Sequence, residues 1–180
     1  MQGAESREMI VVGIDPGIAN TGFGVVRRRA GRLVALDGGV MRTRPERSPE
    51  HRLADLFAQV EELLDRHNPD ALALEAIYFG QNVRSAFAVG QARGVVLMAA
   101  GRRSIPCQDY TPQQVKGAVC GSGRAPKEQV TRMVQSLLAL PEPPTPDHAA
   151  DALAVAICHA NHAPLRSATL RAQVPDARVA

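Results

Sequence analysis

The sequence predicts a single α/β domain, a mixed five-stranded sheet with helices on both of its faces. Two patterns carry this prediction. Three segments of strand-like composition come first and are separated by short turns, which is typical of strands joined as antiparallel hairpins. Helical stripes and short apolar runs then alternate, which is typical of further, parallel strands. The 180 residues are enough for one substantial core, and the sequence contains no evident repeat or second domain.

The first three strands are predicted at residues 9–15, 21–26 and 33–41. The first is a continuous apolar run, as expected of a strand buried on both faces, and Pro16 and Gly17 stop it. A turn containing Gly and Asn leads to the second strand, and an Arg-rich turn at 27–32 leads to the third. Ser48 followed by Pro49 then starts a helix that carries an apolar stripe as far as residue 68.

The rest of the chain alternates strands and helices. Two more strands are predicted at 71–75 and 105–110, and three helices at 82–100, 112–119 and 126–138. Thr145 and Pro146 introduce a last helix that is expected to end near His159. We expect the folded domain to span residues 9–160, with flexible tails at 1–8 and 162–180, because the final segment is polar and has no periodicity.

The composition limits the possible classes of protein. No apolar stretch approaches the ~20 residues that a membrane span needs, and residues 1–8 are too polar for a signal peptide. The three cysteines are odd in number and lack a Cys-x-x-Cys spacing, so we expect reduced thiols in a cytoplasmic protein. The net charge of +3 permits binding to nucleic acid but does not establish it.

Acidic residues occur at positions that the predicted fold would bury. Asp15 and Glu75 each end a short apolar strand, and they would be neighbours if those strands pair. A carboxylate there needs a hydrogen-bonding partner or a cation, because burying an unpaired charge is costly. The last helix adds His148 and Asp151, which are three residues apart and share a face, and Asp147, which is four residues before Asp151.

This set of side chains favours a metal site. Asp151 lies among apolar residues, whereas Asp147 could simply be an acid favoured at a helix start by the macrodipole. Clustered carboxylates repel one another unless a cation compensates, and hard oxygen ligands select Mg²⁺ or Mn²⁺. Two such ions can drive hydrolysis of a phosphodiester, which is the reaction that the pattern favours.

Several segments resemble those of one enzyme family, the RuvC-type Holliday-junction resolvases. The similar segments are Gly13-Ile14-Asp15-Pro16-Gly17, Thr21-Gly22-Phe23-Gly24, Leu74-Glu75-Ala76-Ile77-Tyr78, Gly90-Gln91-Ala92-Arg93-Gly94, Gln114-Val115-Lys116 and Ala149-Ala150-Asp151-Ala152-Leu153-Ala154. They occur in the family's order from about Met9 to His159. The resemblance implies a ribonuclease H-like fold and a Mg²⁺-dependent endonuclease. It would nick two like-polarity strands of a four-way DNA junction and leave 5′-phosphate and 3′-hydroxyl ends that ligase can seal.

The resemblance also implies partners and site residues. The family's metal carboxylates fall on Asp15, Glu75 and Asp151, and its fourth acid falls on His148. A nitrogen ligand or general base at that position should shift the preference of the two metal ions from Mg²⁺ toward Mn²⁺, unless Asp147 supplies an oxygen instead. Members act as homodimers beside a branch-migration motor complex of the RuvA and RuvB type in recombination and repair. We expect the helix at 82–100 to form part of the dimer interface.

Other residues match positions of the family that face DNA. Lys116 and Lys127 are the only lysines of the chain, and both match such positions, Lys116 with a catalytic role. Tyr78 takes the place of the family's wedge aromatic, and Phe79 beside it could also stack on exposed bases. Phosphate contacts are expected from Arg84, Arg93, Arg124 and the arginines at 27–32.

Three other interpretations remain open from the sequence. One is an ATP-binding protein of the actin and sugar-kinase type, although the chain has only one glycine-bracketed Asp hairpin where such proteins have two lobes. Another is a non-catalytic protein that binds junctions. The third is a ribonuclease H-like nuclease that acts on a different nucleic acid.

Overall fold

The computed structural model describes residues 8–76 and 83–173, and the side chains of these ranges except 83–85 and 164–173. The elements in chain order are β1 (Met9–Asp15), β2 (Asn20–Arg29), β3 (Arg32–Arg42), α1 (Pro49–His67), β4 (Ala71–Glu75), α2 (Val83–Arg102), β5 (Cys107–Tyr110), α3 (Pro112–Cys120), α4 (Lys127–Leu137) and α5 (Asp147–Gln173). In the described part of the chain, no helix is long and apolar enough to cross a membrane.

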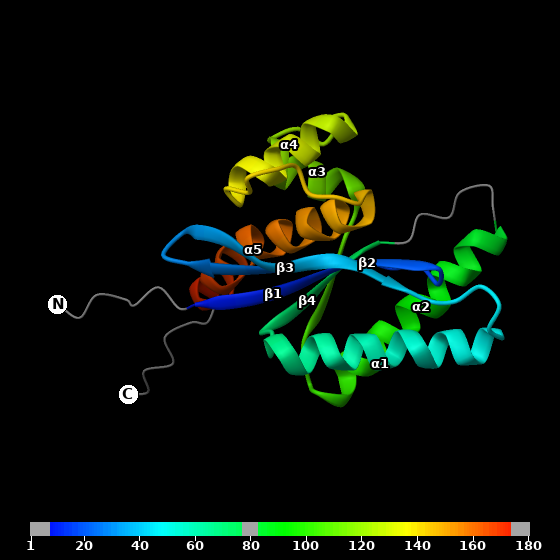
Figure 1. The fold of residues 1–180 in the computed structure, drawn as a ribbon. Coiled ribbons are helices and arrows are strands. Elements are labelled where there is room, and N and C mark those ends of the chain that lie inside the picture. The colour runs from blue at the N-terminus through cyan, green and yellow to red at the C-terminus, as the bar shows by residue number, and fades with distance from the viewer. Residues whose placement is uncertain (1–7, 77–82, 174–180) are drawn as a thin grey trace, which may run out of the picture.

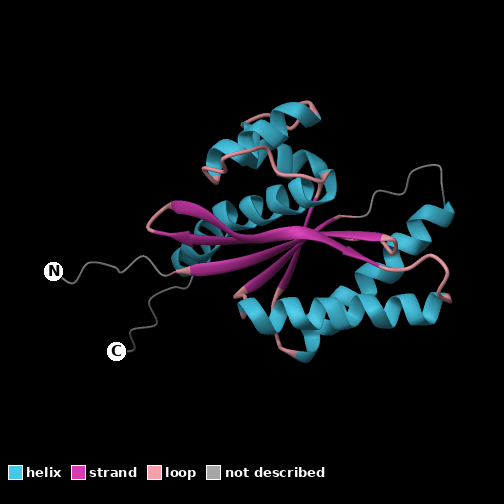
Figure 2. Cartoon of the chain, in the orientation of Figure 1, coloured by secondary structure: helices cyan, strands magenta, loops and turns pink. Residues whose placement is uncertain are grey.

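The five strands form one mixed sheet in the order β3-β2-β1-β4-β5. The first three strands pair antiparallel, and β4 and β5 continue the sheet parallel to β1. Helices α1 and α2 cover one face, and α5 covers the other face with α3 and α4 outside it (Figures 1 and 2). The α/β architecture predicted from the sequence is therefore confirmed.

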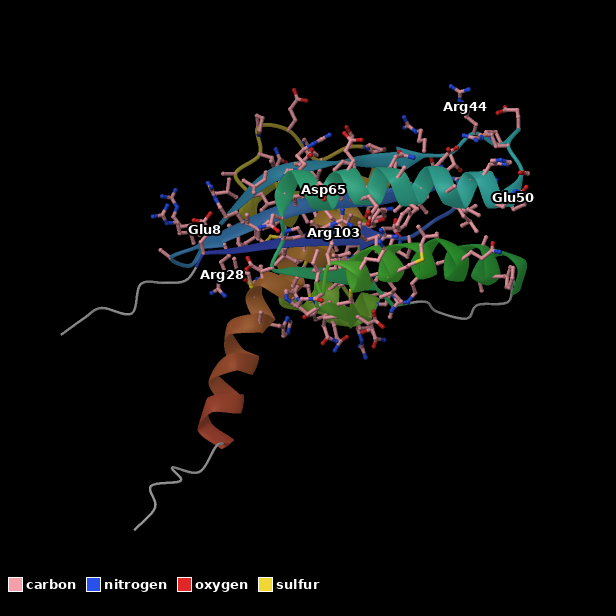
Figure 3. All side chains as sticks on the ribbon, turned by 90° about the horizontal axis from the view of Figure 1, so that it is seen from below. Glu8, Arg28, Arg44, Glu50, Asp65 and Arg103 are labelled. Carbon is pink, nitrogen blue, oxygen red and sulfur yellow. The ribbon has the colours of Figure 1, made fainter. Side chains whose placement is uncertain are left out.

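Alternate residues of β1 feed two separate cores. Val12 and Ile14 pack toward α1 and α2, whereas Val11 belongs to the core under α5. The α1 and α2 layer is also joined by ion pairs, because Arg103, just after α2, contacts Glu61 and, at 2.6 Å, Asp65 of α1 (Figure 3).

The predicted Arg-rich turn at 27–32 is wrong in extent. Strands β2 and β3 continue through most of it, and the turn is reduced to Ala30 and Gly31, which both have positive φ. Two such residues in succession give a hairpin turn whose twist matches that of the strands, so the strands can stay paired to its edge.

The last helix is longer than predicted. It continues to Gln173, so the predicted end near His159 is wrong. Pro164 has no N–H to donate to the carbonyl of Ala160, and Arg28 of β2 donates to that oxygen instead at 2.8 Å. The helix continues past the proline, and its last part projects from the rest of the molecule (Figure 3). Flexibility of this segment stays a prediction.

Candidate active site

Strands β1 and β4 place Asp15 and Glu75 at the same edge of the sheet. The two strands are parallel, and Ile14 pairs with Leu74, so the residue after each lies beside the other. Val11 and Ala73 line the core under α5, and Asp15 and Glu75 follow them by four and two positions respectively, which places each pair on the same face of its strand. Both carboxylates therefore lie on the face that α5 covers.

Glycines allow α5 to come unusually close to this face. A methyl group at Gly13 would overlap the carbonyl oxygen of Ala152 and lie 2.7 Å from the backbone nitrogen of Ala156. A methyl group at Gly22 would likewise overlap the carbonyl oxygen of His148. Because these positions lack a Cβ, the backbone of α5 rests directly on the backbone of β1 and β2.

The close packing brings the helix residues to the strand ends. Nδ1 of His148 lies 2.7 Å from Oδ2 of Asp15. The turn that follows Asp15 is held by Thr21, whose buried hydroxyl accepts from the N–H of Gly17 and donates to its carbonyl. Asp15 thus has a stiff strand before it and a hydrogen-bonded turn behind it.

Burial and mutual repulsion raise the pKa values of both strand-end carboxyls. Burial is the main cause of the raised pKa of Asp15, and the charge of Asp151 adds to it while His148 opposes it. The pKa of Glu75 rises to about 7, mainly through burial and then through the negative charges of Asp15 and Asp151. The charge of Asp151 therefore disfavours ionisation of both strand-end carboxyls, and the charge of Asp15 disfavours ionisation of Glu75.

Lys127 supplies a positive charge at the same place. Its Nζ lies 3.3 Å from Oδ2 of Asp151 and 3.0 Å from Oδ2 of Asp147. Lys127 is the first residue of α4, and the packing of α4 beside α5 brings it there. The sequence pointed to Lys127 as a phosphate ligand but gave no sign of this ion pair with Asp147.

The donor set has the chemistry of a divalent-cation site. Carboxylates and an imidazole are ligands for Mg²⁺ and Mn²⁺, and a bound cation would favour the ionised forms that the protein alone disfavours. Within residues 8–76 and 83–173, no three His, Cys, Asp or Glu side chains already stand as a metal-binding group. Asp15 pairs with the imidazole of His148, and Asp151 pairs with the ammonium of Lys127.

The structure says less about the other predicted site residues. Tyr78 and Phe79 lie outside the described residues, and so does the side chain of Arg84. Arg124 is exposed in the loop before α4. Lys116 lies on α3 and, in the described part of the chain, forms no ion pair.

Two of the arginines predicted to contact phosphate have partners within the fold. The guanidinium of Arg93 pairs with Asp109 at 2.5 Å, and that of Arg28 is held by the carbonyl of Ala160. These interactions join α2 to β5 and β2 to α5, so they stabilise the fold.

Comparison with known proteins identifies the family. Residues 11–159 match the model of the family described as RuvC, crossover junction endodeoxyribonuclease. The crossover junction endodeoxyribonuclease RuvC of Moorella thermoacetica is 52% identical over 158 residues, which cover 88% of this chain and 95% of that protein.

Solved structures agree with this match. Thermus thermophilus RuvC in complex with a Holliday junction substrate superposes with a TM-score of 0.84 at 42% identity, over 88% of this chain and 97% of that one. The yeast mitochondrial Holliday junction resolvase Ydc2 shares the fold, with a TM-score of 0.63 at 17% identity, over 91% of this chain and 83% of that one. The chain therefore belongs to the RuvC family of crossover junction endodeoxyribonucleases, ribonuclease H-like hydrolases that resolve Holliday junctions in DNA recombination and repair.

Proposed function

We propose that this chain cuts four-way junction DNA at the site formed by Asp15, Glu75, His148 and Asp151. The observation that carries the proposal is their convergence: two strand ends and one helix bring these side chains together. Burial, together with the negative charges of Asp15 and Asp151, raises the pKa of Glu75 to about 7. The Thermus relative, at 42% identity, was solved with a Holliday junction, which supports the same substrate here.

In this proposal the four side chains hold two divalent cations per subunit, Mg²⁺ or Mn²⁺. Bound there, the ions would activate the attacking water and stabilise the leaving oxygen of the phosphodiester. Glu75, whose pKa is about 7, must be ionised to act as a ligand, so its proton is released when the site is loaded. Lys127 and Lys116 contribute positive charge to the phosphate, and Tyr78 and Phe79 stack on bases exposed at the junction.

His148 is the residue on which the choice of metal depends. An imidazole nitrogen is a softer ligand than a carboxylate, so Mn²⁺ should support cleavage better than Mg²⁺. A His148→Asp variant should bring the cleavage rates in Mn²⁺ and Mg²⁺ closer together, as measured by single-turnover kinetics in each metal. Equal rates in both metals for the parent chain, unchanged in the variant, would contradict this role of His148.

A homodimer gives one active site for each of the two like-polarity strands. Helix α2 offers a surface for it, because Phe87 is 69% and Met98 is 51% exposed, and nothing lies within 4 Å of a Cβ built at Gly90 or Gly94. These residues recur at helical spacing along one side of α2, as expected of a helix that packs on a second copy. In this proposal the homodimer acts in the cytoplasm beside a branch-migration motor complex of the RuvA and RuvB type.

The decisive experiment replaces Asp15 or Asp151 with Asn. We expect cleavage of a synthetic four-way junction to fall by about a thousandfold, because each change removes a ligand for the cations, while binding of the junction is retained. Glu62→Gln, on the exposed side of α1, is the matched control and should cleave normally.

Other outcomes separate the alternatives. Cleavage that survives Asp15→Asn, or a variant that no longer binds or folds, would contradict the metal-site assignment. A parent chain that binds junctions without cutting them in either metal would be a non-catalytic binding protein. Faster cutting of duplex DNA or of an RNA–DNA hybrid than of the junction would indicate a different substrate.

A further inference from the structure

Asp147 has no part in the proposed metal site, yet it contacts a residue that does act there. Its Oδ2 lies 3.0 Å from Nζ of Lys127, and the same ammonium lies 3.3 Å from Oδ2 of Asp151. Asp147 and Lys127 are the first residues of α5 and α4. One cation of the chain is therefore shared between two carboxylates that stand one helical turn apart.

The two carboxylates are not equivalent. The Asp151 side chain is 34% exposed and helps to raise the pKa of Glu75, so it belongs with the partly buried acids. The Asp147 side chain is 81% exposed. When a divalent cation takes Asp151 as a ligand, that carboxylate is less available to Lys127, and the two positive charges repel each other.

Lys127 also has a reason to leave this position. A positive charge in the first turn of a helix is opposed by the helix macrodipole, and Lys127 is the first residue of α4. Without an acidic neighbour other than Asp151, a loaded site would therefore displace its ammonium toward solvent.

We propose that Asp147 is a positioning residue, which keeps the Lys127 ammonium at the edge of the active site while Asp151 binds the cation. The inference rests on the proposed function, because it requires Lys127 to act on the phosphate. In this arrangement Asp147 provides a second anchor on the outer side of Lys127, and the lysine stays within reach of the DNA.

A simpler role for Asp147 makes a different prediction. A solvated acid at the start of α5 would stabilise the helix through the macrodipole and repel DNA phosphates. Its removal would then tighten the binding of junctions and leave the rate of the bound complex unchanged.

The test compares Asp147→Asn with Glu128→Gln. Both changes remove one negative charge from an exposed acid in the first turn of a helix, and Glu128 adjoins Lys127 in sequence without forming an ion pair in the described part of the chain. We expect Asp147→Asn to lower kcat for junction cleavage by about fivefold at saturating metal, with KM unchanged or lower. Glu128→Gln should leave kcat unchanged, and Asp147→Glu should restore most of it.

A Lys127→Met background shows whether the effect passes through the lysine. There, Asp147→Asn should have no further effect on kcat, because no ammonium remains to be positioned. Binding of Mn²⁺ in the absence of DNA gives a second readout. Asp147→Asn should weaken it by about twofold more in the Lys127 chain than in the Lys127→Met background, since Lys127 would then pair with Asp151 alone.

The outcomes distinguish this inference from the function on which it rests. If Asp147→Asn lowers kcat no more than Glu128→Gln does, or lowers it equally in the Lys127→Met background, the positioning role is overturned and the nuclease assignment stands. If Lys127→Met cleaves like the parent chain, the proposed role of Lys127 is wrong and the inference fails with it. Failure of the nuclease itself would appear separately, as cleavage that survives Asp15→Asn.

Discussion

The two faces of the sheet are packed in different ways. Toward α1 and α2, the core consists mainly of large aliphatic side chains, such as Leu56, Leu72 and Leu74. Toward α5, glycines of β1 and β2 meet the helix backbone directly, and the buried residues of α5 are mostly alanines. Both faces bury apolar surface, but only the second also holds a helix backbone directly against the strand backbones. Only the second face carries the proposed chemistry.

This difference follows from what each kind of contact can do. Aliphatic side chains can repack by changing rotamers, so they tolerate small shifts of a helix. Contact between two backbones has no such freedom, so it fixes the distance between α5 and β1. The distance of 2.7 Å between Nδ1 of His148 and Oδ2 of Asp15 depends on this spacing of α5 from β1.

The largest expected effect is that of Gly13→Ala. The added methyl group overlaps the carbonyl oxygen of Ala152, so α5 must move away from β1. We expect a loss of about 3 kcal/mol in the free energy of unfolding, measured by denaturant titration. Cleavage by the folded variant should fall by about a hundredfold, because His148 and Asp151 move relative to Asp15. A variant that is destabilised yet cuts normally would show that the interlock does not set the geometry of the site.

Leu56→Ala tests the opposite face. Leu56 is fully buried under the sheet, so its truncation should also cost about 3 kcal/mol in the free energy of unfolding. Under conditions where the variant is folded, however, its single-turnover cleavage rate should stay within about twofold of the parent rate. A large loss of cleavage would mean that packing on this face also controls the site.

Glu75→Gln tests the electrostatic side of the comparison. The pKa of Glu75 is about 7 in the folded chain and near 4.5 when unfolded, so the folded state binds more protons between these values. The stability that this group contributes is present below pH 4.5 and is lost as the pH rises through 7. Without metal, the parent chain should therefore lose on the order of 2 kcal/mol across this window, and the variant should lose less.

Thermal unfolding at several pH values measures this effect. Added Mg²⁺ or Mn²⁺ should reduce the pH dependence of the parent chain, because a cation favours the ionised carboxylate. Parallel pH profiles for the parent and variant chains would contradict the raised pKa of Glu75.

The sequence was sufficient for the parts of this architecture that depend on local pattern. The apolar runs ending in Asp15 and Glu75 predicted both strands, and their pairing placed the carboxylates together, as the structure confirms. The spacing of His148 and Asp151 predicted their common helix face for the same reason.

Features that depend on packing between elements were beyond the sequence. The ion pair of Lys127 with Asp147 requires α4 to lie beside the start of α5, and no periodicity specifies that contact. The carbonyl of Ala160, which Pro164 leaves without a helical donor, accepts from Arg28, which is far away in sequence. In both cases a charged side chain contacts a group that only the tertiary structure brings near it.

The smallest expected effect has the opposite sign. Gly101 lies in the last turn of α2, where nothing occupies the space within 4 Å of an added Cβ. Gly101→Ala should therefore stabilise the chain by about 0.5 kcal/mol, because alanine loses less backbone entropy on folding. The substitution is the same as at Gly13, but Gly13 lies in a strand against the backbone of α5, whereas Gly101 lies in a helix with open space around it. If both variants were destabilised alike, the cost at Gly13 would belong to the substitution itself and not to the contact between α5 and the sheet.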